Sequence, residues 1–165
     1  MVAPAALLAA ALSVPFVPQE KDTCAAASLA MVVRYWRQPV SQAEIVAALM
    51  AGGEGDGGDL QAQPPGILGS RLAEYARSRG FTAIAYEGDL PQLREHVSKG
   101  RPLIVAWRVG RDRYHDVVVV GFEEARGEVL VNDPAEGAGR RVPEKDFEKR
   151  WAGAGHWTLL VVPKQ

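Results

Sequence analysis

The most restrictive feature of this 165-residue sequence is the order in which its apolar patterns occur. In the first half, apolar residues recur at helical spacing, as Leu29, Val32, Val33 and Trp36 do within the segment Cys24–Arg37. In the second half, short β-branched runs separated by Gly-containing turns predict strands. Helices first and strands later are typical of an α+β fold, in which the N-terminal helices pack on an antiparallel sheet.

Capping and turn residues set the boundaries that we expect for these elements. Asp22 and Thr23 offer N-cap chemistry to the first helix, and Ser41-Gln42-Ala43-Glu44 is a capping box that starts a second helix reaching about Met50. Further helices are expected at 67–79, 89–99 and 143–151. Strands are expected at 81–86, 102–109, 115–122, 128–133 and 156–162. Gly52–Gly58 lacks the lysine and the spacing of a phosphate-binding loop, so we predict a plain connecting loop.

Composition fits one domain with a full hydrophobic core, which we expect over residues 14–165. Apolar residues make up 47% of the chain, charged residues 24%, and the formal net charge is −1. No basic face or run stands out, so no nucleic-acid partner is expected.

The start of the chain is apolar, since Met1–Leu12 is almost entirely Ala, Leu, Val and Pro. About a dozen residues are too few to span a bilayer, so we expect no integral membrane segment. Two interpretations of residues 1–13 stay open. They are a docking arm, or the remnant of a secretory signal with Ala11-Leu12-Ser13 as its cleavage site, although a positively charged start is missing. The signal interpretation favours an extracytoplasmic location.

Cys24 is the only cysteine, which excludes an intrachain disulfide and a multi-cysteine zinc site. No metal-ligand cluster is present in the sequence pattern, and no cofactor is expected. A lone cysteine is either a small buried hydrophobe or a reactive thiol. Cys24 falls in the first turn of the first predicted helix, where unpaired amides and the helix dipole favour a thiolate. Its position therefore favours the reactive thiol.

A thiol nucleophile needs a base, and the chain has three histidines. His96 lies in a charged helix and His156 lies beside a tryptophan, whereas His115 opens an apolar strand at the end of the sheet. The next strand ends at Asp133, whose carboxylate is placed to accept the ring N–H of His115. Asp116 points to the opposite face of the strand and is less suitable. Asp133 also lies in an Asn-Asp-Pro sequence, so a role in a turn stays open.

Attack on a carbonyl creates an oxyanion, which must meet hydrogen-bond donors already in place. The backbone amide of Cys24 is one such donor. Gln19, on the extended segment before the helix, is a candidate second donor. Taken alone, a surface polar residue is the simpler interpretation of Gln19.

These residues resemble a known family. The segment VPFVPQEKDTCAAASLAMVVRYW is similar to the catalytic segment of the bacteriocin-processing cysteine peptidases, the papain-like family that removes double-glycine leaders and has freestanding bacterial members. KGRPLIVAW, HDVVVVGFEE with VLVNDPAEG, and DFEKRWAG match further segments in the same order. The resemblance implies a papain-like fold, a peptide or protein substrate, and cleavage after small residues such as glycine. It assigns Cys24 as nucleophile, His115 as general base and acid, Asp133 as orienting group and Gln19 to the oxyanion.

The sequence also departs from the family pattern. Ala25-Ala26-Ala27 follows the cysteine where the family usually has glycine and then another small residue, which narrows the approach to the thiol. The transporter-linked members carry membrane and ATP-binding domains that are not found in these 165 residues, so we expect no export by this polypeptide alone. Trp107 and the Gly52–Gly58 loop are candidates to line the cleft. Two alternatives to peptide hydrolysis stay open: a dormant domain that binds a peptide or protein partner, and acyl transfer to an acceptor other than water.

Overall fold

A computed structural model describes residues 11–51 and 60–165, so most of the apolar arm and the whole Gly52–Gly58 loop lie outside the described residues. The helices are α1 (Cys24–Tyr35), α2 (Gln42–Ala51), α3 (Pro65–Ser78), α4 (Leu90–Ser98) and α5 (Glu144–Ala152), with 3-10 turns η1 (Leu60–Ala62) and η2 (Glu124–Arg126). The strands are β1 (Phe81–Glu87), β2 (Leu103–Val109), β3 (Arg113–Glu123), β4 (Glu128–Asp133), β5 (Gly137–Pro143) and β6 (Trp157–Pro163).

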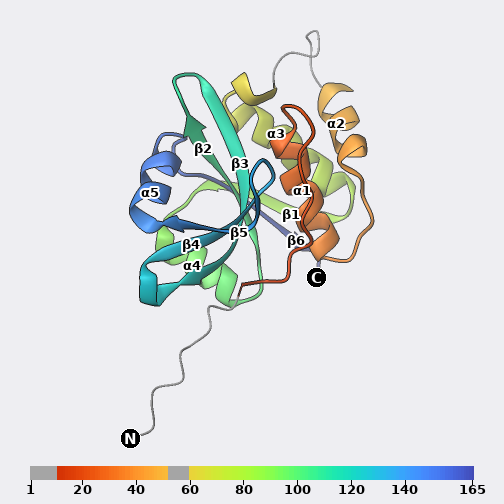
Figure 1. The fold of residues 1–165 in the computed structure, drawn as a ribbon. Helices are drawn as coiled ribbons and strands as arrows, with labels where there is room; N and C mark the ends of the chain where they lie inside the picture. Colours follow the sequence, from red (N-terminus) through yellow and green to blue (C-terminus); the bar gives the residue numbers. More distant parts are fainter. Residues whose placement is uncertain (1–10, 52–59) are drawn as a thin grey trace, which may run out of the picture.

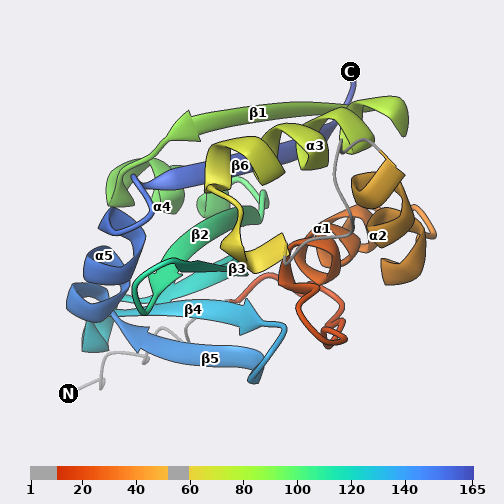
Figure 2. The ribbon, with the colours of Figure 1, turned by 90° about the horizontal axis from the view of Figure 1, so that it is seen from above.

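The strands form one six-stranded antiparallel sheet in the order β1-β6-β2-β3-β4-β5. Helices α1, α2 and α3 gather on one side of it, and α3 runs along β1 and β6 (Figures 1 and 2). The α+β prediction, with N-terminal helices on an antiparallel sheet, is confirmed. None of the helices in the described part of the chain is long and apolar enough to cross a membrane.

The sheet is buried on both faces, because its strands alternate between two cores. Ile104, Val118 and Val120 face α1, α2 and α3. Their neighbours Val105 and Val119 face the opposite way, toward α4 and α5. This alternation puts consecutive residues of β3 on different sides of the sheet, and that separation shapes the site described below.

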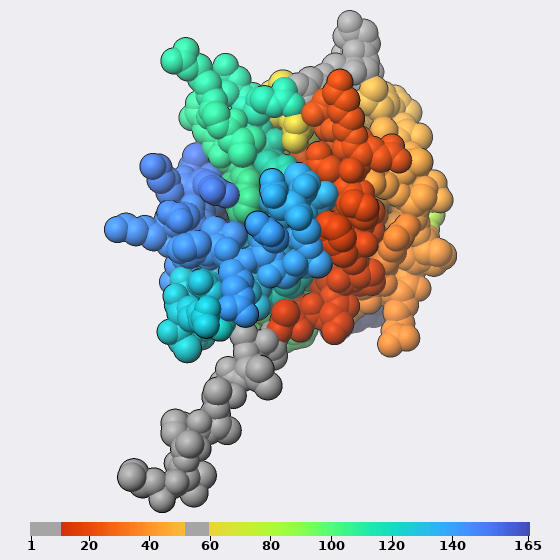
Figure 3. All heavy atoms as spheres, in the orientation of Figure 1, coloured from red at the N-terminus to blue at the C-terminus, as the bar shows by residue number. Residues whose placement is uncertain are grey.

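Helix α1 is buried along most of its length, and Ala26, Ala27 and Leu29 are fully inaccessible. Its small first turn allows the helix to lie close to β3, in the middle of the molecule. The segment before α1 lies directly against the β4–β5 turn, as the adjoining red and blue surfaces in Figure 3 show, and the Gln19 amide donates to the Pro134 carbonyl at 2.9 Å. The chain packs from before Val14, since Leu12 donates to the Val120 carbonyl at 2.8 Å.

Two local features of the fold differ from what the sequence predicted: one strand was missed, and one expected helix cap is absent. Strand β5 was not predicted. Gly137 and Gly139 have left-handed backbone angles, and only Val142 of this edge strand is buried, so the segment shows no apolar alternation that would indicate a strand.

The expected N-cap chemistry of α1 is also absent. Thr23 occupies the N-cap position without a side-chain capping bond; its hydroxyl faces two acceptors, the Glu20 carbonyl and Gln42 Oε1, which share its single proton. The Ser41 cap of α2 is present, with the Glu44 amide 3.1 Å from the Ser41 hydroxyl.

Candidate active site

Cys24 is the first residue of α1 and is buried, with 3% of its surface exposed. Its sulfur accepts hydrogen bonds from the Asp116 backbone N–H at 3.5 Å and from the Gln61 side-chain amide at 3.6 Å. No side chain caps the helix, so the first-turn amides remain available to stabilise negative charge near Sγ. The local geometry therefore suits a thiolate.

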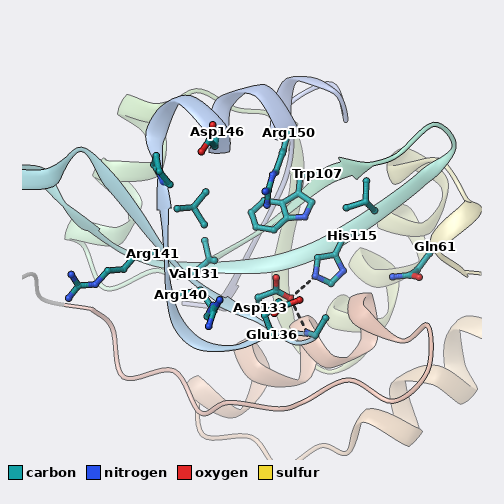
Figure 4. Close-up of a pocket in the computed structure, with 14 residues that line it drawn as sticks. Gln61, Trp107, His115, Val131, Asp133, Glu136, Arg140, Arg141, Asp146 and Arg150 are labelled. Atoms are coloured by element: carbon teal, nitrogen blue, oxygen red, sulfur yellow. Dashed lines mark hydrogen bonds and ion pairs between the residues drawn. The ribbon is translucent and has the colours of Figure 1, made fainter.

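His115 and Asp133 form a buried pair next to this thiol. His115 Nε2 lies 2.6 Å from Asp133 Oδ1, and both side chains are 9% exposed (Figure 4). Asp133 ends β4, and its Oδ1 also accepts the Ala135 amide at 2.9 Å, which fixes the carboxylate. Because Nε2 faces Asp133, the second ring nitrogen Nδ1 is left for the thiol of Cys24.

The pKa values of this pair move in opposite directions. Burial by itself lowers the pKa of His115, but hydrogen bonds to Asp133 and Cys24, with the charges of both groups, raise it to about 10. Burial would raise the pKa of Asp133, yet its bonds to His115 and to the Ala135 and Glu136 amides hold it below the ordinary value. The site thus stabilises an imidazolium beside the sulfur.

Two side chains of helix α1 hydrogen-bond to the backbone of Asp116 on β3. The Asp116 N–H donates to Cys24 Sγ, and its carbonyl accepts the hydroxyl of Ser28, which lies one turn further along α1, at 3.2 Å. Since His115 immediately precedes Asp116, these two bonds set the position of the imidazole relative to the sulfur. Ser28 is fully buried, so water does not replace it.

We expect Ser28→Ala to lower the free energy of unfolding by about 1 kcal/mol, because it leaves the buried Asp116 carbonyl without this donor. Urea unfolding measures the change. Ser98→Ala is the matched control: it removes an exposed hydroxyl that bonds the Glu95 carbonyl, and we expect a change within about 0.5 kcal/mol. Equal effects of the two substitutions would mean that the Ser28 hydroxyl does not stabilise the contact between α1 and β3.

Gln19 is placed next to the site by its backbone, through its bond to Pro134, directly after Asp133. Its Oε1 is buried without a hydrogen-bond partner among the described residues. The sequence did not point to Gln61, which reaches Cys24 from η1 across 37 positions and also accepts a bond from Arg113. No local pattern in a sequence signals such a long-range contact.

The other two histidines lie elsewhere in the fold. His96 is on α4, where its Nδ1 is 3.3 Å from a guanidinium nitrogen of Arg101, and His156 Nε2 is 2.6 Å from Glu148 Oε1. In the described residues, no group of three or more His, Cys, Asp or Glu side chains is arranged to hold a metal ion.

Two hollows flank the Cys24–His115 pair. The larger, about 530 Å³, lies on the His115 side and includes Trp107, whose ring centre is 6.0 Å from that of His115 (Figure 4). The guanidinium of Arg150 lies 5.2 Å above the Trp107 ring. The smaller hollow, about 10 Å³, lies on the opposite side of the thiol and is lined by Cys24 and Asp116.

Comparison with known proteins finds the same fold in solved structures. A Bacillus anthracis protein described as a C39-like peptidase superimposes with a TM-score of 0.73 at 19% identity, over 96% of this chain and 99% of that one. A double glycine motif protease from an AMS/PCAT transporter, solved in complex with the leader peptide, gives 0.69 at 26% identity over 93% and 94%. The peptidase domain of Streptococcus ComA, a bi-functional ABC transporter, gives 0.67 at 22% over 90% and 97%.

No curated protein matches the sequence. Residues 11–158 match the family described as Peptidase_C39 like. This match spans most of the chain and contains every residue of the site described above. The chain therefore belongs to the Peptidase_C39 like family.

Proposed function

We propose that this protein is an active cysteine peptidase, which hydrolyses a peptide bond through an acyl-thioester on Cys24. The observation that carries the proposal is the buried His115–Asp133 pair beside a thiol at an uncapped helix N-terminus. His115 acts as base toward the thiol and then as acid toward the leaving amine. Asp133 orients the imidazole, and Gln19 with the Cys24 amide meets the oxyanion.

The same chemistry orients the substrate across the site. The leaving amine takes its proton from His115, so the C-terminal product lies in the larger hollow beside Trp107. The acyl part stays on the sulfur and faces the smaller hollow, where Ala25 also lines the wall. Ala25 narrows the approach to the sulfur, which favours small residues such as glycine before the scissile bond. The relative solved with a leader peptide supports a peptide substrate.

The test is turnover of peptides that contain a double glycine, followed by mass spectrometry of the products. Hydrolysis gives a free carboxylate after glycine, whereas acyl transfer gives an amide when an external amine is added. A covalent acyl adduct on Cys24 in quenched reactions identifies the thioester. An unreactive thiol together with measurable peptide binding would replace this proposal with a dormant binding domain.

We expect Gln19→Ala to lower kcat about a hundredfold, because one oxyanion donor is lost from a water-poor site. Alkylation of Cys24 by iodoacetamide forms no oxyanion, so its rate should stay at the wild-type value. This split between turnover and alkylation separates an oxyanion role from general damage to the site. An unchanged kcat would mean that Gln19 does not bind the oxyanion and is a polar residue of the surface.

A further inference from the structure

Two oxygen groups at the smaller hollow have no hydrogen-bond donor in the part of the chain that the structure describes. Asp116 is 6% exposed and lines the hollow, yet in residues 11–51 and 60–165 its hydrogen bonds run only through its backbone. Gln63 Oε1 lines the same hollow and is buried without a partner within that part of the chain. Leu60, Leu68 and Ala25 supply apolar walls.

A buried carboxyl without a donor is costly, and native proteins rarely keep one. Burial raises the pKa of Asp116 to about 7, although the nearby imidazolium of His115 opposes the shift. The structural task of this residue, which is to hold β3 against α1, is done by its backbone and needs no carboxyl. Among the described residues the carboxyl therefore has no hydrogen-bonding role, and a donor supplied by a ligand would give it one.

We propose that this hollow binds an ammonium group on the acyl side of the substrate, with the Asp116 carboxylate and Gln63 Oε1 as its acceptors. The inference rests on the proposed peptidase function and adds a substrate class to it. Asp116 lies on the face of β3 opposite His115, hence on the acyl side of the sulfur.

The size of the hollow restricts the ligand further. Its volume of about 10 Å³ is roughly the room that one water needs. A compact ammonium fits this space better than a planar guanidinium. The ammonium has two possible sources, a lysine side chain before the residue at the scissile bond or the free N-terminus of a short peptide.

The experiment compares fluorogenic amides that differ in one group. Acetyl-Lys-Gly and acetyl-norleucine-Gly amides test the side chain, with acetyl-Arg-Gly as the guanidinium comparison, while free and acetylated Ala-Gly amides test the N-terminus. We expect kcat/KM to be at least about tenfold higher for one ammonium-bearing member than for its neutral partner. In Asp116→Asn this ratio should fall to about one, whereas Asp112→Asn, an exposed residue of the β2–β3 turn, should keep it.

A second measurement does not depend on amide hydrolysis. Acetyl-Lys-Gly, acetyl-norleucine-Gly, and free and acetylated Ala-Gly chloromethyl ketones alkylate Cys24 directly, and the rate of inactivation should show the same preference. A preference seen with the ketones but with no amide turnover would overturn the peptidase proposal and keep this one. If each charged compound reacts at the same rate as its neutral partner, in the wild type and in both Asp116→Asn and Gln63→Ala, the ammonium site is wrong. Amide turnover by the wild type would in that case still support the peptidase proposal.

Discussion

Replacement of Cys24 by alanine is expected to reduce peptide hydrolysis to the uncatalysed background. The acyl-thioester cannot form without the sulfur, and removal of a nucleophile from a catalytic unit costs about a thousandfold to a millionfold in kcat. The side chain is 3% exposed and small, so the folded structure should persist. Turnover of a double-glycine peptide measures the loss, and urea unfolding checks the fold.

The same variant gives a clean measure of thiol chemistry, because Cys24 is the only cysteine in the chain. Any iodoacetamide adduct on the wild-type protein therefore reports on this site alone, and Cys24→Ala should show none. Cys24→Ala should still bind the peptide, since binding does not need the covalent bond. Residual turnover well above background in this variant would show that another group attacks the substrate.

The sequence predicted the elements that local chemistry determines. Prolines, glycines and capping residues marked the ends of α2, α3 and α4, and β-branched runs marked the central strands. Alternation along β3 separated His115 from Asp116, and in the structure the two residues line different hollows, as that alternation requires. These inferences needed only the neighbours of each residue along the chain.

The sequence did not predict features that depend on distant parts of the chain. Strand β5 has little β-branched content and exists because β4 offers it a free edge. Thr23 would cap α1 by its residue type, but its hydroxyl is turned toward Gln42 Oε1 and makes no bond to the α1 amides. The contact of Gln61 with the sulfur and the unpartnered carboxyl of Asp116 likewise appear only when η1, α1 and β3 are assembled. The most specific parts of the site are therefore its least predictable parts.

Replacement of His115 by alanine is expected to change both catalysis and the pH dependence of the thiol. The native pKa of about 10 keeps the imidazole protonated through the neutral range, where its charge favours the thiolate of Cys24. Wild-type alkylation should thus persist below pH 7. In His115→Ala the rate should rise only near the free-thiol pKa of about 8.5, so at pH 6 it should be lower by about two orders of magnitude.

His96→Ala is the control, since His96 lies on α4 and contacts Arg101 rather than Cys24. We expect it to leave the alkylation profile and kcat almost unchanged, while His115→Ala loses at least about a thousandfold in kcat. A profile that rises only near the free-thiol pKa in the wild type as well would mean that the pair does not activate the sulfur. A large loss in His96→Ala would mean that the wrong histidine has been assigned.

The raised pKa of His115 also makes the stability of the fold depend on pH. The folded pKa, about 10, lies above the ordinary value of 6.5, so the native state binds this proton more tightly than the unfolded chain does. The stabilisation is complete below about pH 6.5 and is lost as the pH rises toward 10. The difference in unfolding free energy between wild type and His115→Ala, measured with urea, should therefore shrink between pH 6 and pH 9.5, and a difference that grew would contradict a protonated imidazole in the native site.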